Sequence, residues 1–188
     1  MAVLMVSKND EKNIREKLRK IIKEKALLKD LAVNLSSGEK SNYYFDMKQV
    51  SMRKEPRKLI AALIGEMIKD HNITAVGGIA TGANPIIDTI IDFCDVEYGF
   101  YVRKKRKEHG LEKYIEGVLE SGDRVLVVDD VSTKGNSIIE CIKAIEDKNI
   151  KIVKVLTIVD RLEGASENLL KIGYTLEHLF TRDDFEIE

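Results

Sequence analysis

Short apolar runs separated by amphipathic stretches are the feature that most constrains how this chain can fold. Strands that read as continuous apolar runs are typical of a parallel sheet covered on both faces. The stretches between them have apolar residues at helical spacing. This alternation predicts the α/β class, a Rossmann-like parallel sheet flanked by helices. The expected strands are 73–78, 98–102, 124–128 and 150–159, and the expected helices between them are 55–71, 85–93 and 136–148.

The segment before the alternating part has a different pattern. Residues 9–28 carry apolar side chains at helical spacing between charges, and 34–48 read as a loop or hairpin leading into a strand. With 188 residues, the chain is long enough for one domain with a substantial core. We therefore expect a single domain over 1–188, with an N-terminal helix and substrate loop at 1–48 and an α/β core at 55–165. The N-terminal part is expected to form a small hood subdomain over the edge of the sheet.

Charge and cysteine content exclude several classes of protein. The formal net charge is -1, so the protein as a whole has no electrostatic reason to bind nucleic acid or an anionic membrane. Cys94 and Cys141 have no CxxC spacing, which fits a reducing compartment rather than a disulfide framework or a zinc cluster. The opening MAVLMV is too short for a signal peptide, and no run approaches a membrane span. We expect a soluble, cytoplasmic protein.

The stretch VLVVDDVSTKGNS at 125–137 places two adjacent carboxylates where a buried strand is expected to end. In open α/β sheets, ligands bind beyond the carboxyl ends of strands, where the next helix presents free N–H groups. Gly135 lets successive amides converge on an anion, and Thr133 and Ser137 add hydroxyl donors. Because carboxylates repel phosphate, Asp129 and Asp130 are interpreted as acceptors for the hydroxyl groups of a ribose. The stretch therefore predicts a sugar-phosphate site.

In this order of residues, the stretch resembles the phosphoribosyl pyrophosphate (PRPP) motif of the type I phosphoribosyltransferases. The resemblance implies the fold of that family. It implies that the loop cradles the 5-phosphate and that the acidic pair, with a catalytic role, contacts the ribose. Lys134 stands where a small residue is expected, and it either reaches the phosphate or points to water. The PRPP-binding residues implied here are Asp129, Asp130, Val131, Ser132, Thr133, Lys134, Gly135, Asn136 and Ser137.

The basic run RKKRKEHG at 103–110 resembles the mobile catalytic loop of the orotate phosphoribosyltransferases, with Lys105 in place of the usual Glu. The resemblance implies that Arg103, Lys104, Lys107 and His109 bind PRPP and that Lys107 and His109 are catalytic. Cations that close over the departing pyrophosphate stabilise the charge that grows as the C1–O bond breaks.

Two further stretches resemble the orotate-binding segments of the same family. SSGEKSNYYFD at 36–46 is similar to its N-terminal substrate loop, which implies that the pyrimidine stacks on Phe45. VDRLEGA at 159–165 is similar to its Asp-Arg-x-Glu segment, which implies that Arg161 binds the orotate carboxylate through its planar fork. Thr133 is also placed at orotate by the resemblance.

The glycine-rich turn GGIATGANP at 77–85 resembles the pyrophosphate loop of this family, in which Thr81 and Gly82 supply backbone amides. The resemblance implies the transfer of a phosphoribosyl group from PRPP to orotate, giving orotidine 5′-monophosphate and pyrophosphate in pyrimidine biosynthesis. It also implies Mg²⁺ that arrives with the substrate near Asp129 and Asp130 rather than through a dedicated protein site, and a homodimer in which the mobile loop of one subunit completes the site of the other.

Other interpretations of these stretches stay open at this point. The acidic pair can instead be solvated residues that cap the next helix, Tyr43 and Tyr44 can belong to a hairpin core, and Asp160–Arg161 can be a surface ion pair. The basic run can be a nucleic-acid patch or a solvated loop. The enzyme can use another base, such as a purine or uracil. A regulator that senses PRPP without catalysis would need a basic face or a DNA-binding domain, and the sequence has neither.

Overall fold

The structure is a computed structural model that describes residues 8–34, 40–103 and 114–187. Its centre is a six-stranded sheet with the order β5-β4-β3-β6-β7-β8. All neighbouring strands are parallel except β5, which pairs antiparallel with β4. The predicted α/β class with a mostly parallel sheet is confirmed. The strands are β3 (Ala75–Ile79), β4 (Tyr98–Val102), β5 (Ile115–Gly117), β6 (Arg124–Ser132), β7 (Lys151–Asp160) and β8 (Leu176–Thr181).

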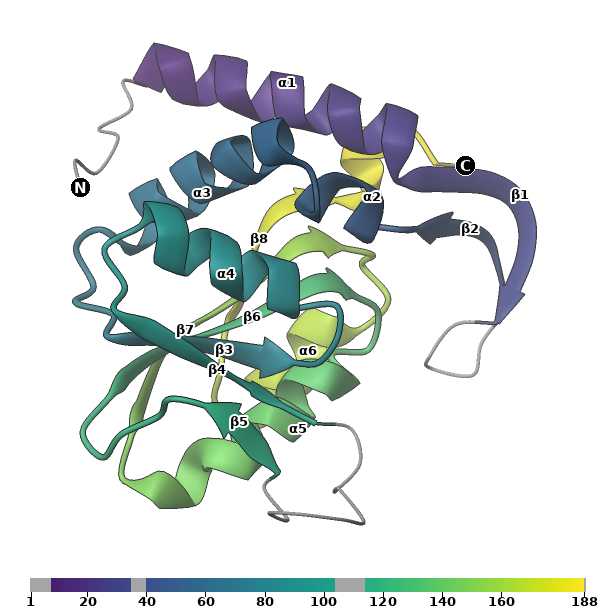
Figure 1. Ribbon diagram of the computed structural model, residues 1–188. Coiled ribbons are helices and arrows are strands. Elements are labelled where there is room, and N and C mark those ends of the chain that lie inside the picture. Colours follow the sequence, from purple (N-terminus) through teal and green to yellow (C-terminus); the bar gives the residue numbers. More distant parts are fainter. Residues whose placement is uncertain (1–7, 35–39, 104–113, 188) are drawn as a thin grey trace.

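Helices cover both faces of this sheet (Figure 1). On one face lie α3 (Lys54–Ile68) and α4 (Asn84–Phe93), and on the other lie α5 (Asn136–Ile145) and α6 (Ala165–Leu170). Side chains that alternate along a strand point to opposite faces. Accordingly Val76 and Leu126 belong to the core under α3 and α4, whereas Ala75 and Val125 belong to the core under α5 and α6. The continuous apolar runs of the sequence are explained by these two separate cores.

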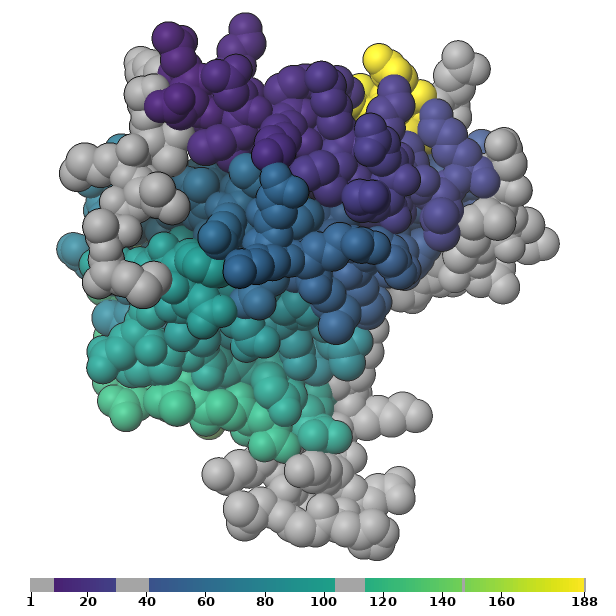
Figure 2. Space-filling view, turned by 45° about the horizontal axis from the view of Figure 1, so that its top comes forward, coloured from purple at the N-terminus to yellow at the C-terminus, as the bar shows by residue number. Residues whose placement is uncertain are grey.

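The N-terminal segment forms a layer of its own above α3. Helix α1 (Lys8–Lys25) packs against α3, and Figure 2 shows the two helices side by side. Leu18 and Ile22 of α1 are fully buried in the same core as α3 and α4. After α1, the chain forms an antiparallel hairpin of β1 (Leu27–Asn34) and β2 (Lys40–Phe45), and then the short helix α2 (Lys48–Ser51). The hairpin lies beyond the carboxyl ends of the central strands (Figure 1).

Several element boundaries differ from the sequence-based expectations. The first helix was expected to reach residue 28, but it ends at Lys25. Strand β1 begins at Leu27 instead, because the backbone there pairs with β2. Strand β6 continues to Ser132, four residues beyond its expected end, because its pairing with β7 continues past the apolar run. The sequence did not predict β5, α2, α6 or β8. The helix expected at 136–148 ends at Ile145, and the chain continues as the 3-10 turn Glu146–Lys148. Among the described helices, none has the length and apolar character to cross a membrane.

A buried carboxylate ties three strands together at the end of the sheet opposite the hairpin. Asp123 is 5% exposed and precedes β6. Its Oδ1 accepts hydrogen bonds from the Thr74 and Tyr98 hydroxyls, at 2.7 and 2.8 Å, and its Oδ2 accepts one from the Glu120 N–H at 2.7 Å. The bond to Asp123 and partial burial raise the pKa of Tyr98 to about 12, so this hydroxyl keeps its proton and donates. We assign Asp123 a structural role.

Substitution of Asp123 tests this role. Asp123→Asn replaces an acceptor oxygen by an NH₂ group that faces a donor, and we expect it to lower the free energy of unfolding by about 1–3 kcal/mol. Urea denaturation measures the change. Asp88→Asn, the same chemical change at an exposed position of α4, is the control and is expected to change stability by less than about 0.5 kcal/mol. Equal effects of the two substitutions would contradict the assignment.

Candidate active site

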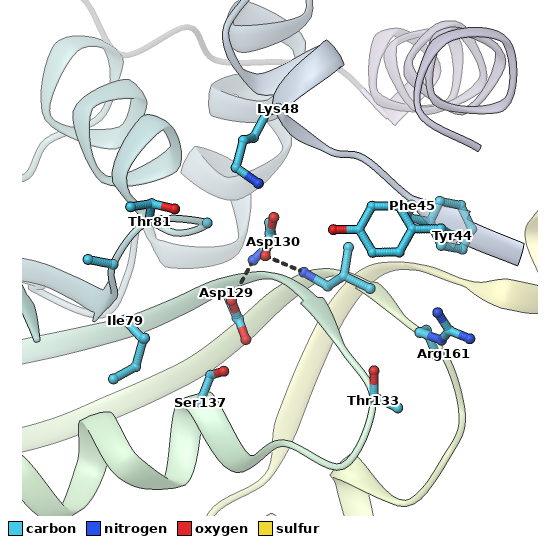
Figure 3. Close-up of a pocket in the computed structure, with 13 residues that line it drawn as sticks. Tyr44, Phe45, Lys48, Ile79, Thr81, Asp129, Asp130, Thr133, Ser137 and Arg161 are labelled. Atoms are coloured by element: carbon cyan, nitrogen blue, oxygen red, sulfur yellow. Dashed lines mark hydrogen bonds between the residues drawn. The ribbon is translucent and has the colours of Figure 1, made fainter. Parts of the chain in front are cut away.

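A cavity of about 480 Å³ opens at the carboxyl ends of β3 and β6. From β3 the chain proceeds to β4 on one side, while β6, β7 and β8 follow on the other side, so the strand order reverses between β3 and β6. Such a switch point leaves a crevice in which ligands of open α/β sheets bind. The cavity wall, drawn in Figure 3, consists of residues 44, 45, 48, 79–82, 129–131, 133, 137 and 161.

The acidic pair lies inside β6 rather than beyond its end. Pairing of β6 with β3 stops at Val127, but pairing with β7 runs on to Ser132. The last residues of β6 therefore have an open edge toward β3. Asp129 and Asp130 point to opposite sides of the strand, Asp129 toward Ser137 and Asp130 toward the side of Thr81 (Figure 3). Both carboxylates line the cavity.

Local hydrogen bonds hold these two side chains. Asp129 Oδ1 accepts from the Asp130 N–H at 3.0 Å, and Asp130 Oδ1 accepts from the Val131 N–H at 3.0 Å. Asp129 is 7% exposed, and the N-cap of α5 is Gly135 with no side-chain cap. The alternative in which the pair consists of solvated helix caps is therefore wrong.

The turn after β6 leads into α5 through a glycine. Gly135 has φ 75°, a left-handed value, and it directly precedes α5, whose first N–H groups have no partner within the helix. Thr133 and Ser137 line the cavity together with Val131. Ser132 is 1% exposed and is absent from the cavity wall, as are Lys134, Gly135 and Asn136. Of these, Asn136 lines a separate surface pocket with Tyr114 and Glu140.

The opposite wall is the turn between β3 and α4. The Ala80 N–H donates to Val102 and the Ala83 N–H donates to Ile79, but no acceptor in the described parts of the chain takes the N–H of Thr81 or Gly82. A Cβ at Gly82 would lie 2.6 Å from Asp130 Oδ1. Glycine thus lets this turn approach the acidic strand, with two backbone donors beside the cavity.

Arg161 forms the far end of the cavity and is 2% exposed. Its Nε donates to Glu163 Oε1 at 3.1 Å, its Nη2 donates to Ser41 Oγ at 2.9 Å, and its guanidinium lies 4.0 Å from the centroid of the Tyr43 ring. The Tyr43 hydroxyl donates to the same Glu163 oxygen at 3.0 Å. Burial raises the pKa of Tyr43, against the opposing effect of the Arg161 charge, so the hydroxyl keeps its proton. The alternative of an Asp160–Arg161 surface pair is wrong.

The two neighbouring aromatic residues of β2 have different surroundings. Phe45 is 3% exposed and packs edge-to-face against Tyr43 and Phe185, with ring centroids 5.9 and 5.1 Å apart. It lines the cavity but is anchored in the core. Tyr44 is only partly buried, and its hydroxyl points into the cavity (Figure 3). Tyr43 belongs to the buried core, in agreement with the alternative interpretation that placed it in the core of the hairpin.

The basic run is only partly visible. Lys104, Lys107 and His109 lie outside the described residues, as do Ser37 and Gly38 of the substrate loop. Arg103 is described, and it forms an ion pair of 3.3 Å with Glu116 rather than lining the cavity.

Sequence reasoning gave no individual role to three residues that the structure brings to the site, although Tyr44 belonged to the recognised substrate loop. Lys48 and Tyr44 line the cavity, and Glu163 holds Arg161. Glu163 belonged to the recognised Asp-Arg-x-Glu pattern, so that pattern contained a usable signal. Lys48 had none, because nothing in the local sequence shows which of many lysines faces a cavity.

Comparisons with known proteins find similar proteins over most of the chain. Residues 48–176 match the phosphoribosyl transferase domain family. The chain is 38% identical over 172 residues to orotate phosphoribosyltransferase of Aquifex aeolicus, covering 88% of this chain and 94% of the relative. It is 39% identical over 167 residues to the enzyme of the same name from Methanocaldococcus jannaschii, covering 89% and 94%. A crystal structure of Mycobacterium tuberculosis orotate phosphoribosyltransferase in complex with PRPP is 31% identical, with TM-score 0.77, covering 93% of this chain and 99% of that one.

The contact between Gly82 and Asp130 yields a testable expectation. Gly82→Ala places a methyl group against a carboxylate that is fixed by the Val131 N–H, so the carboxylate must move. We expect at least about a tenfold loss of affinity for a sugar phosphate ligand, as for loss of a hydrogen bond to a charged group. Calorimetric titration with PRPP measures it. Gly65→Ala, in α3 and outside the cavity wall, is the control and is expected to keep the affinity, because its Cβ would meet Cys94 Sγ at an ordinary 3.6 Å. Unchanged affinity in Gly82→Ala would contradict the proposed importance of this contact.

Proposed function

This chain belongs to the orotate phosphoribosyltransferase family, and from that premise we propose how its residues bind two substrates and transfer a phosphoribosyl group. The enzyme transfers the 5-phosphoribosyl group of PRPP to orotate, giving orotidine 5′-monophosphate and pyrophosphate in pyrimidine biosynthesis. The observation that supports the assignment to this cavity is that its two ends carry different kinds of groups. A phosphate-type turn and two carboxylates occupy one part, and a buried, pre-oriented guanidinium occupies the other.

PRPP is proposed to lie along β6. The turn from Thr133 to Ser137 binds the 5-phosphate through its N–H groups and hydroxyls, where the N-terminus of α5 favours negative charge. Asp129 and Asp130 accept hydrogen bonds from the ribose hydroxyls. The N–H groups of Thr81 and Gly82, which have no acceptor within the described chain, then face the pyrophosphate.

Orotate is proposed to bind at the Arg161 end. Glu163 and Ser41 occupy the Nε and Nη2 groups of Arg161, while Nη1 donates to no acceptor among the described residues. We assign Nη1 to the carboxylate of orotate, with Thr133 nearby on the cavity wall. Tyr44 then presents its hydroxyl-bearing ring to the pyrimidine, next to the anchored Phe45. Because the guanidinium is already oriented, binding requires little further ordering of this side chain.

The chemistry asks for positioning and charge stabilisation. A ring nitrogen of orotate attacks the anomeric carbon while the bond from that carbon to the pyrophosphate oxygen breaks, through a state with oxocarbenium character. The proton of the ring nitrogen passes to the departing pyrophosphate. Holding both substrates in line supplies much of the rate enhancement. Negative charge grows on the departing pyrophosphate, and the proposed groups that stabilise it are Lys104, Lys107 and His109 of the basic run. Arg103, at the start of this run, forms an ion pair with Glu116.

The residues of the cavity fit Mg²⁺ that is held mainly by substrate. The described residues contain no group of three or more side chains that could hold a metal ion by themselves. Mg²⁺ is commonly bound by one or two carboxylates plus substrate phosphates, and Asp129 and Asp130 line the cavity as such a pair. When bound, the ion would neutralise charge on the pyrophosphate.

Two further parts of the proposal concern the state of the protein in the cell. A homodimer would allow the basic run of one subunit to close the cavity of the other. A cytoplasmic location is supported by Cys94 and Cys141, which are both free thiols. Sedimentation equilibrium tests the first point, and a monomer with full activity would refute it.

Orotate absorbance in the presence of PRPP and Mg²⁺ tests the function directly. We expect orotate to be consumed only when both are present, and pyrophosphate to appear in equal amount. Uracil, adenine and hypoxanthine, assayed separately for nucleotide formation, are expected not to react. If one of these bases reacts while orotate does not, the substrate assignment is wrong. If PRPP binds but no base is consumed, the chain is a sensor rather than an enzyme.

Arg161→Lys tests the orotate end of the cavity. Lysine keeps the charge but loses the planar fork that Glu163 and Ser41 orient. We expect the KM for orotate to rise about 10–100-fold, from loss of a charge-assisted hydrogen bond, with the KM for PRPP nearly unchanged. Arg53→Lys, at an exposed position outside the cavity, is the control. An equal rise of both KM values in Arg161→Lys would count against a specific contact with orotate.

Lys107→Ala tests the role of the basic run. Because its charge is proposed to act on the departing pyrophosphate, we expect kcat to fall about 100-fold or more while the KM for PRPP changes little. Steady-state kinetics at saturating orotate give both parameters. A loss confined to the KM for PRPP would show that Lys107 only binds the substrate.

A further inference from the structure

Lys48 lies at the cavity in a position that the residue roles given so far leave unexplained. It is the first residue of α2, and the buried side chains of Met47 and Val50, 1% and 0% exposed, fix the backbone on either side of it. Its own side chain is exposed and lines the cavity. Figure 3 shows its ammonium group directed into the cavity on the side of Asp130 and Thr81. The fold thus anchors α2 and directs this cation inward.

The charges around the cavity explain why a cation is needed there. The ionisable groups of its wall, apart from Tyr44, are the two aspartates, Lys48 and Arg161. Arg161 already forms a 3.0 Å ion pair with Glu163. Within the described residues no ion pair or hydrogen bond engages the ammonium group of Lys48. A polyphosphate that enters therefore meets two carboxylates, and Lys48 is the cation of the described cavity wall that is not already in an ion pair and can offset them.

The turn at Gly82 cannot supply this charge itself. A Cβ there would lie 2.6 Å from Asp130 Oδ1 and 2.9 Å from its Cγ, so a side chain at this position would displace the Asp130 carboxylate. The turn offers only backbone N–H groups to the pyrophosphate. A cation for the same group must come from another element, and Lys48 of α2 lines the same cavity, with its ammonium group directed toward Asp130 (Figure 3).

We propose that Lys48 binds the pyrophosphate group of PRPP, opposite the N–H groups of Thr81 and Gly82. This inference rests on the proposed function for its ligand. An ammonium on a flexible stem with three donors suits phosphoryl oxygens, because it can follow them as the C1–O bond lengthens. The contact is a charge-assisted hydrogen bond in a partly enclosed site, so it stabilises both the bound substrate and the leaving group. Lys48 is therefore a substrate-binding residue supplied by the N-terminal layer.

The test separates the two halves of PRPP. Lys48→Met keeps the length of the side chain and removes its charge. By calorimetry with Mg²⁺, we expect binding of pyrophosphate to weaken about tenfold or more, from loss of a hydrogen bond to a charged group, and binding of ribose 5-phosphate to stay unchanged. The KM for PRPP is expected to rise by a similar factor, while the KM for orotate stays unchanged. Lys48→Arg, which keeps a cation, is expected to recover most of the pyrophosphate affinity.

Lys58→Met is the matched control, since Lys58 is exposed on α3 and lies outside the cavity wall. It is expected to match the unsubstituted protein in every measurement. Unchanged pyrophosphate binding in Lys48→Met, or weakening only toward orotate or only toward ribose 5-phosphate, would overturn the proposal. If the unsubstituted protein consumes no orotate, the proposed function fails by itself, and the pyrophosphate titration still decides the role of Lys48.

Discussion

The site depends on the fact that β6 is longer than the strand beside it. Beyond Val127, β6 is held by β7 alone, so its other edge is free for the turn at 80–82 to approach. This approach needs residues without bulk. A Cβ at Gly78 would lie 2.3 Å from the Val128 carbonyl oxygen, and one at Gly82 would meet Asp130. A difference in strand length thus sets the width of the cavity and brings carboxylates, backbone donors and a phosphate turn into one space.

The two cations of the cavity wall differ in a way that suits two different ligands. Arg161 is buried and held by an ion pair, a hydroxyl and an aromatic ring, which fits recognition of a rigid, planar carboxylate. Lys48 is exposed and attached to a short helix whose backbone is anchored. Its freedom fits a group whose charge and position change during the reaction. Fixed geometry at the base and adjustable geometry at the leaving group are consistent with the transfer of one group between two bound partners.

The sequence was most informative where the residues of a function are contiguous. The acidic pair, Thr133 and Ser137 could be found because strand, turn and helix follow each other within one short stretch, and the same holds for Arg161 in its own motif. The apolar runs likewise gave the central strands, since burial on both faces determines their composition. The end of β6 was misplaced because aspartates interrupt the apolar pattern without interrupting the backbone pairing with β7. Lys48 and β8 escaped prediction because their roles depend on tertiary neighbours far away in the sequence.

The bonds around Arg161 also join distant parts of the chain. Ser41 and Tyr43 belong to the hairpin strand β2, whereas Arg161 and Glu163 follow β7, 120 residues away. The guanidinium is therefore both a ligand group and part of the attachment that keeps the hairpin docked on the sheet. By thermodynamic linkage, a carboxylate ligand that binds more tightly to the oriented guanidinium must also stabilise the state in which the hairpin is docked. The rate at which amide protons of β1 and β2 exchange with solvent then becomes a measure of occupancy at the base site.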